Sequence, residues 1–132
     1  MHVRGLAHLS LFVSDIERSL AFYTKVLGFT KTYYQDRADI FYAEIAAGNR
    51  VAEVVQWKDP SENGRWVGKR GTLDHVALEV ANLDAAAAEL SGAGIPIVDG
   101  PFELPDLNGG IRGLFIHGPD GERVELLQKL SK

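Results

Sequence analysis

A repeat within the sequence limits what this chain can fold into. Residues 6–13 and 73–80 both alternate apolar with less apolar positions, and each carries a histidine at its third position, His8 and His75. Strict alternation over eight residues is typical of a β-strand with one buried face. The two histidines lie 67 positions apart in a chain of 132 residues, and this spacing indicates two similar modules.

The repeat continues beyond the histidine strands. Asp15 and Asn82 each come seven residues after the corresponding histidine, and both residue types favour the start of a helix. An amphipathic or alanine-rich helical pattern follows each of them and ends at a glycine. Each module then ends with a strand that holds one glutamate between apolar residues, Glu53 in the first and Glu125 in the second.

The order of the elements predicts an α+β fold with two βαβββ modules that form a cupped mixed sheet around a cleft. The expected strands cover 5–13, 29–35, 39–46, 50–57, 72–81, 111–117 and 122–130, and the expected helices cover 16–27 and 83–93. The segment 96–110 is rich in proline and glycine and is predicted to be a short strand and a long irregular loop. We expect one domain, 1–132, with module 1 at about 4–58, a polar linker at 59–70 and module 2 at about 71–130.

Composition excludes several classes of function. The chain has no cysteine, which rules out disulfides, thiolate nucleophiles and cysteine metal ligands. Its formal net charge of −4 argues against nucleic acid as a partner, and no apolar stretch reaches the length that spans a membrane. The first residues do not resemble a signal peptide, so we expect a cytoplasmic protein with no membrane partner.

The repeat also defines a candidate site, because each module supplies one histidine and one glutamate: His8, Glu53, His75 and Glu125. Strand alternation places all four on the sheet face away from the helices. Two imidazoles and two carboxylates that meet between pseudo-symmetric modules suit a divalent ion such as Zn, Ni, Co, Mn or Fe(II). Taken singly, each residue is equally compatible with a hydrogen-bonded or solvated strand position, and the duplication favours a metal site. His117 has no counterpart in the other module and is interpreted as structural.

Several segments carry a resemblance to a known family. They are His8 with Val-Ser-Asp at 13–15, the helix 19–28, Asp-His-Val-Ala at 74–77, and the ending formed by 100–101, 109–110, 119–121 and 124–126. Together they resemble the vicinal oxygen chelate superfamily of glyoxalases, bleomycin resistance proteins and dioxygenases, over essentially the whole chain. The most similar branch is short bacterial glyoxalase I, or lactoylglutathione lyase, whose metal ligands are His, Glu, His and Glu. The resemblance implies His8, Glu53, His75 and Glu125 as the corresponding ligands here.

This resemblance implies a metal-dependent lyase or isomerase with one divalent metal ion as cofactor and a small molecule as substrate. Such an enzyme moves a proton next to a carbonyl through a metal-chelated enediolate. His8 and His75 are implied as fixed ligands, and Glu53 and Glu125 as ligands of which at least one is the catalytic base. The resemblance also implies a homodimer.

Other branches of the superfamily remain open. Epimerases of a 2-keto or CoA substrate look similar but carry glutamine at the position of Glu53. Extradiol-type dioxygenases use two histidines and one glutamate, and a bound Glu53 would fill a position that dioxygen or substrate needs. Drug-binding resistance proteins are usually free of metal, so metal content separates them from the enzymes.

Two positions differ from the glyoxalase I pattern and bear on the substrate. Phe12 stands where that family has an arginine that holds glutathione, and Trp57 stands where it has an asparagine. Both offer apolar, stacking surface in place of polar partners, so we expect them to bind substrate, with weak or no glutathione dependence. The alternative is that both aromatics belong to the sheet core. Arg4, Arg70 or Arg112 could supply compensating charges.

Overall fold

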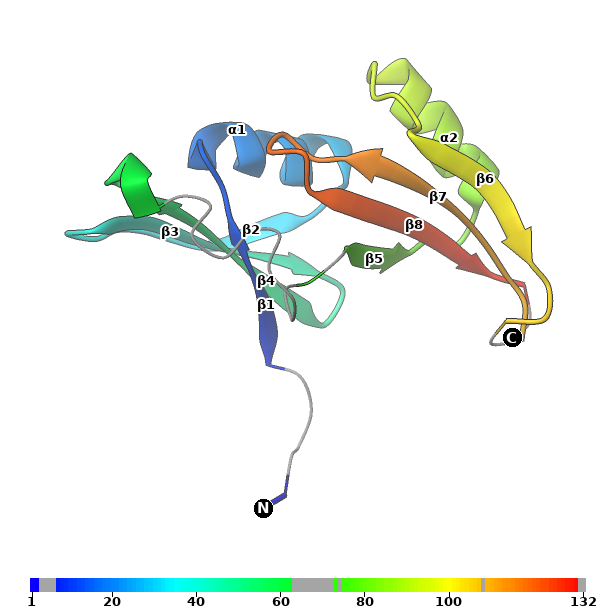
Figure 1. Cartoon of the computed structure of the whole chain (residues 1–132), viewed down its shortest axis with the longest axis horizontal. Helices are drawn as coiled ribbons and strands as arrows, with labels where there is room; N and C mark the ends of the chain where they lie inside the picture. Colours follow the sequence, from blue (N-terminus) through cyan, green and yellow to red (C-terminus); the bar gives the residue numbers. More distant parts are fainter. Residues whose placement is uncertain (3–6, 63–72, 74, 108, 131–132) are drawn as a thin grey trace. The chain divides into compact units, whose positions relative to one another are not determined.

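The computed structural model describes residues 1–2, 7–62, 73, 75–107 and 109–130. Contacts divide the chain into two compact units, Met1–Arg70 and Gly71–Lys132. Each unit builds its own four-stranded sheet (Figure 1).

The sheet of the first unit has the strand order β1-β4-β3-β2. Its elements are β1 (His8–Phe12), α1 (Ile16–Ala21), the π-helical turn η1 (Phe22–Val26), β2 (Thr30–Asp36), β3 (Ile40–Ala47), β4 (Arg50–Trp57) and the short turn η2 (Pro60–Glu62). β1 runs parallel to β4, whereas the β4–β3 and β3–β2 pairs are antiparallel.

The second unit repeats this arrangement with the strand order β5-β8-β7-β6. Its elements are β5 (Val76–Glu79), α2 (Leu83–Gly92), β6 (Asp99–Leu104), β7 (Ile111–His117) and β8 (Arg123–Lys129). β5 runs parallel to β8, and the other two pairs are antiparallel. The predicted fold class, α+β with two βαβββ modules that each hold a mixed sheet, is therefore confirmed.

Each helix packs on one face of its own sheet. α1 packs against β4 and β3, and α2 packs against β8 (Figure 1). Val54 and Val124, the strand residues next to the two site glutamates, are fully buried. Because successive strand residues point to opposite faces, Glu53 and Glu125 point away from these buried valines.

The two helices begin in the same way. Asp15 and Asn82 are the N-cap residues, as predicted, and each has extended backbone angles. The Asp15 carboxylate accepts a hydrogen bond of 3.1 Å from the backbone N–H of Arg18, and the Asn82 side chain accepts one of 3.0 Å from that of Ala85. These contacts satisfy N–H groups that have no partner within the helix.

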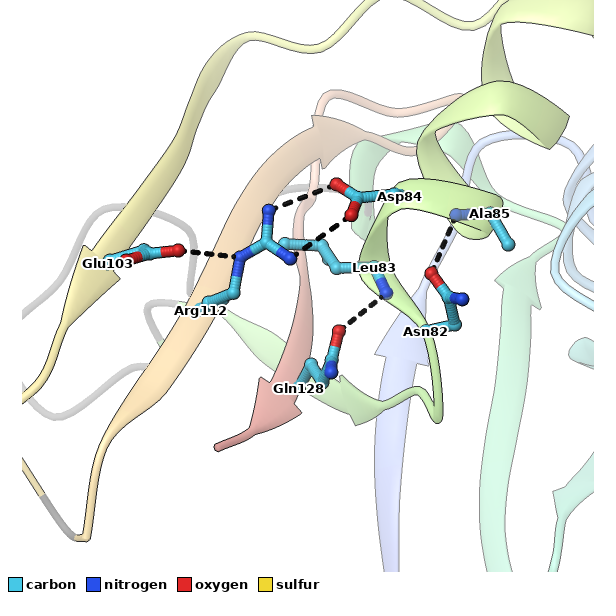
Figure 2. Close-up of polar contacts among 7 residues, drawn as sticks. All are labelled: Asn82, Leu83, Asp84, Ala85, Glu103, Arg112 and Gln128. Atoms are coloured by element: carbon cyan, nitrogen blue, oxygen red, sulfur yellow. Dashed lines mark hydrogen bonds and ion pairs between the residues drawn. The ribbon is translucent and has the colours of Figure 1, made fainter. Parts of the chain in front are cut away.

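A glutamine on the last strand of each unit adds a second contact to the helix start. Gln56 accepts a hydrogen bond from the backbone N–H of Ile16, and Gln128 accepts one from that of Leu83, both at 2.8 Å. Figure 2 shows the second of these contacts beside the Asn82 cap. Each glutamine follows the site glutamate of its strand by three positions, so one strand both carries the glutamate and fixes the helix start.

The segment 96–110 is more regular than we predicted. It contains β6, which forms the edge of the second sheet and pairs with β7. The pairing register shifts between Asp99 and Phe102, so Gly100 and Pro101 occupy an irregularity within the strand. Glycine and proline are tolerated at bulges and in edge strands, which explains why the sequence pattern resembles a loop.

Other limits differ from the predicted ones. The predicted helix 16–27 changes from α to π geometry after Ala21. β1 and β5 are shorter than the predicted strands 5–13 and 72–81, and residues 5, 6, 72 and 74 lie outside the described part of the chain. So do residues 63–70 of the predicted linker, and the module limits stay a prediction.

Candidate functional site

The first candidate pair joins β1 to β4. In the parallel register of these strands Ser10 lies opposite Glu53, and His8 lies two residues before Ser10 on the same face. His8 Nε2 lies 3.4 Å from Glu53 Oε1, and the two side chains are 46% and 21% exposed. The register thus brings two possible metal-ligand atoms, an imidazole nitrogen and a carboxylate oxygen, together on a partly exposed face of the sheet.

The second pair repeats this geometry. Ala77 lies opposite Glu125 in the β5–β8 register, and His75 lies two residues before Ala77, directly ahead of β5. His75 Nε2 lies 3.2 Å from Glu125 Oε2, and the two side chains are 35% and 10% exposed. In both units the histidine lies two residues before the residue that is opposite the glutamate. The repeat in the sequence is therefore also a repeat in the arrangement of each histidine and glutamate.

The spacing within each pair fits two ligands of one metal ion. N–H···O hydrogen bonds measure about 2.7–3.2 Å, so the contact in the first unit is longer than this range and the contact in the second lies at its upper end. Two ligand atoms that each lie about 2.1 Å from a shared ion are roughly 3.0 Å apart at a right angle and about 3.4 Å apart at a tetrahedral angle. The observed 3.4 Å and 3.2 Å lie in this range. An imidazole nitrogen and a carboxylate oxygen are also suitable donors for borderline divalent ions.

The structure brings the four predicted ligands together as two pairs, one in each unit. Among the described residues, no group of three or more His, Cys, Asp or Glu side chains is placed to hold one ion. The convergence of both pairs on a single ion therefore stays a prediction.

Glu53 has polar neighbours on β3. Glu44 lies directly opposite it in the antiparallel register, and Tyr42 lies two residues further on the same face. Tyr42 Oη lies 2.9 Å from Glu53 Oε1 and 2.8 Å from Glu44 Oε1. Burial raises the pKa of Tyr42, and its hydrogen bonds to the two carboxylates raise it further. The phenol is therefore a hydrogen-bond donor at neutral pH.

Glu125 has apolar neighbours instead. Phe115 lies opposite it on β7, and Gly113 takes the position that Tyr42 has in the first unit. A Cβ added to Gly113 would lie 2.6 Å from Phe102 Cζ and 3.2 Å from Glu125 Oε1. The Phe102 ring thus occupies the space that a side chain at 113 would need, and it stacks with Phe115 at a centroid distance of 6.0 Å. The two glutamates occupy equivalent positions in unlike surroundings.

Tyr42, Glu44 and Phe102 are site neighbours that the sequence prediction missed. Tyr42 and Glu44 are two residues apart in the predicted strand 39–46, and this spacing is a signal that they share a face. Which residues lie beside them depends on the register between β3 and β4, and a slip of one residue would turn them to the other face. Phe102 lies in the segment predicted to be largely irregular.

The predicted substrate contacts, Phe12 and Trp57, form an aromatic pair on the first sheet. Their ring centroids are 6.3 Å apart and their planes are inclined by 29°. Strand alternation places Phe12 on the face of His8, and Trp57 on the face of Glu53. Phe12 is 49% exposed, so it is not part of the core of the described unit. The pair offers an accessible apolar surface on the face that carries the first His–Glu pair.

Arg112 forms ion pairs with two carboxylates of its own unit (Figure 2). Its guanidinium donates to Asp84 at 3.0 and 3.3 Å, and its Nε lies 3.0 Å from Glu103 Oε1. The hydrogen bond from Arg112, and then its charge, lower the pKa of Asp84. Arg112 therefore links α2 to β6 and β7 and is not a free charge for an anionic substrate. Arg4 and Arg70 lie outside the described residues.

None of the helices formed by the described residues is long and apolar enough to span a membrane.

Comparisons with known proteins agree with the fold. A family model described as "Glyoxalase/Bleomycin resistance protein/Dioxygenase superfamily" matches residues 5–126. The chain is 30% identical over 129 residues to the virulence protein STM3117 of Salmonella typhimurium (strain LT2), which covers 97% of this chain and 86% of that protein. It is 30% identical over 135 residues to the lactoylglutathione lyase of Escherichia coli O157:H7, which covers 94% of this chain and 92% of that protein.

A solved structure shows the same fold. It is that of TnmS3, described as an antibiotic binding protein from Streptomyces sp. CB03234. The TM-score is 0.76 at 24% sequence identity, over 98% of each chain. At this identity the likeness concerns the fold.

Proposed function

This chain belongs to the glyoxalase/bleomycin resistance protein/dioxygenase superfamily, and from that premise we propose that it is a metal-dependent lyase or isomerase of the glyoxalase I type. The observation that carries the proposal is the duplicated His–Glu pair. Both pairs have the same strand offset, and their donor atoms lie 3.4 Å and 3.2 Å apart. A fold alone does not define an activity, so the proposal depends on these four side chains.

His8, Glu53, His75 and Glu125 would together hold one divalent ion, in the manner of a two-His, two-carboxylate site. When bound, the ion would act as a Lewis acid that stabilises negative charge on a substrate oxygen beside the reacting carbon. The two imidazoles would be fixed ligands of this ion. At least one of the two carboxylates would accept the proton from the carbon next to the carbonyl and return it to a neighbouring carbon.

The proposed substrate is a small molecule with an apolar portion. Phe12 and Trp57 present stacked rings on the sheet face that carries His8 and Glu53. Arg112, a candidate for binding a charged substrate such as a glutathione adduct, is already ion-paired with Asp84 and Glu103. We therefore expect the enzyme to use a substrate that is less polar than a glutathione conjugate.

A second candidate function is the binding of a drug-like molecule without conversion. The exposed ring of Phe12, paired with the half-buried Trp57, favours it, because stacking surface alone can retain a planar ligand. TnmS3, which is named an antibiotic binding protein, has the same fold. A binding protein of this kind has no need for the four His and Glu ligands, so metal binding distinguishes the two candidates.

The test is metal binding by the purified chain after it has been stripped of ions. Titration calorimetry and elemental analysis with Ni²⁺, Zn²⁺ and Co²⁺ should show about one ion per four-ligand site. His8→Ala and His75→Ala should each weaken binding at least tenfold, because each removes one direct ligand. His117→Ala is the matched control, since this exposed histidine on β7 belongs to neither pair. A wild-type chain that binds no ion, or three variants that bind like wild type, would rule out the proposed enzyme.

A further inference from the structure

A chain of side-chain contacts crosses the first sheet from β3 to β1. Tyr42 Oη lies 2.8 Å from Glu44 Oε1 and 2.9 Å from Glu53 Oε1. His8 Nε2 lies 3.4 Å from the same Glu53 oxygen. The oxygen of Glu53 that faces His8 is thus also the oxygen that Tyr42 contacts.

We propose that Tyr42 is a positioning residue for the metal site: its hydroxyl donates to Glu53 Oε1 and holds this oxygen beside His8. The inference rests on the proposed function, because it concerns the ligand set assigned there. A carboxylate on a strand can rotate about its terminal bonds, and a donor fixed in the sheet restricts this rotation before the ion binds. Hydrogen bonds of this kind to ligating carboxylates orient the ligand and strengthen metal binding.

The surroundings of Tyr42 hold its hydroxyl in place. Its ring meets the ring of Tyr33 edge-on, with centroids 6.0 Å apart and an interplanar angle of 68°. Glu44 Oε1 lies 2.8 Å from the same hydroxyl and is its other possible acceptor. A phenol has one hydrogen, so it donates to one of the two carboxylates at a time. The hydroxyl of Tyr42 can therefore donate either to Glu53 or to Glu44. With a cation bound at the proposed site, it would donate to Glu53.

The second unit shows that the fold does not require this tyrosine. The equivalent position is Gly113, and the ring of Phe102 takes the space of its missing side chain. The same sheet, register and His–Glu pair form there without a phenol. The module therefore does not need the hydroxyl of Tyr42 in order to fold, and this hydroxyl contacts the carboxylates of Glu53 and Glu44.

The test compares the ion affinity of Tyr42→Phe and Tyr33→Phe by titration calorimetry with Ni²⁺ and Zn²⁺. Tyr33→Phe is the control because it removes a hydroxyl from the neighbouring ring, which bonds Gln35 and not Glu53. Tyr42→Phe should bind the ion roughly 10- to 100-fold more weakly, which is the usual effect of removing an outer hydrogen bond to a ligand. Tyr33→Phe should bind within about twofold of wild type, since exposed substitutions away from a site have small effects.

A double-mutant cycle then separates positioning from a general effect on the sheet. If Tyr42 acts through Glu53, its removal should have almost no further effect on affinity in a Glu53→Ala chain, so the two losses should not add. Fully additive losses would overturn the inference. So would a Tyr42→Phe chain that binds like wild type, or an equal loss in Tyr33→Phe. If the wild-type chain binds no ion, the proposed function fails as well, and this result is distinct from the others.

Discussion

Two equivalent glutamates of this protein differ in what surrounds them. Glu53 accepts a hydrogen bond from Tyr42 and is 21% exposed, whereas Glu125 lies beside Phe102 and is 10% exposed. A phenol hydroxyl contacts Glu53, whereas aromatic rings lie beside Glu125, so the two carboxylates have different partners available. The internal repeat therefore places the two glutamates at equivalent strand positions but gives them different neighbouring side chains.

Separate changes of the two glutamates to glutamine should distinguish ligation from proton transfer. Glutamine keeps an oxygen that can coordinate an ion, but it cannot accept a proton at neutral pH. Both variants should retain about one ion per site, and the variant that loses the base should turn over its substrate about 100- to 10,000-fold more slowly. The measurements are turnover of the true substrate and bound metal for each variant. Rates close to wild type in both would mean that neither glutamate moves the proton.

Glutathione dependence should be weak and should respond to residues 12 and 57. The methylglyoxal–glutathione hemithioacetal should be a poor substrate, because Phe12 and Trp57 supply neither the positive charge of an arginine nor the amide of an asparagine. Phe12→Arg with Trp57→Asn should improve kcat/KM for this adduct about tenfold or more, since each hydrogen bond to a charged group contributes roughly 1.5–3 kcal/mol. Turnover by the wild-type chain at ordinary glyoxalase efficiency would contradict the prediction.

At the scale of elements, one strand in each unit fixes a helix start and carries a site glutamate. Gln128 on β8 holds the backbone N–H of the buried Leu83, and Gln56 on β4 does the same for the buried Ile16. These contacts tie each helix to the strand that it covers. The placement of the glutamate and the placement of the helix are therefore coupled through the same backbone segment.

Removal of either glutamine should destabilise the protein. Gln56→Ala and Gln128→Ala each remove the acceptor of a part-buried backbone N–H, which should cost about 1–3 kcal/mol in the free energy of unfolding. Gln35→Ala on the exposed edge strand β2 is the control and should stay within about 0.5 kcal/mol of wild type. Urea denaturation of the metal-free proteins measures all three. Equal stability of the three variants would show that the glutamine contacts contribute little.

At the scale of the whole molecule, the question is whether both His–Glu pairs serve one ion. An ion that binds only the folded chain stabilises it, by about 2.7 kcal/mol at a free concentration of 100 times Kd, and raises Tm by several degrees. If one ion uses both pairs, His8→Ala and His75→Ala should each abolish most of this increase. The double variant should then differ little from either single variant.

The alternative is that each His–Glu pair binds its own ion. Two independent sites would leave a substantial metal-dependent increase of Tm in each single variant, and only the double variant would lose it. Differential scanning fluorimetry with and without Ni²⁺ distinguishes the two cases, with His117→Ala as the control. The homodimer implied by the family resemblance also stays a prediction, and sedimentation of the metal-loaded chain tests it.

The two modules, the superfamily and the set of four candidate ligands could all be predicted from the sequence alone. These follow from local signals: strand alternation, cap residues at Asp15 and Asn82, and a histidine on the first strand and a glutamate on the last strand of each module. Alternation assigns a residue to a face without any knowledge of its partner strand. In the structure, the register of β1 with β4 places His8 relative to Glu53 in the same way as the register of β5 with β8 places His75 relative to Glu125.

The pairing of each histidine with its glutamate, and the residues around each pair, depend on contacts between distant segments. Tyr42 reaches Glu53 because of the antiparallel register between β3 and β4, and Phe102 reaches Glu125 because β6 continues through an irregularity at Gly100 and Pro101. Neither registers nor bulges follow from a single-strand pattern, since both depend on pairing between segments distant in sequence. Local periodicity thus identifies the candidate ligands and the sheet face that each occupies, whereas long-range pairing brings each histidine to its glutamate and sets what surrounds them.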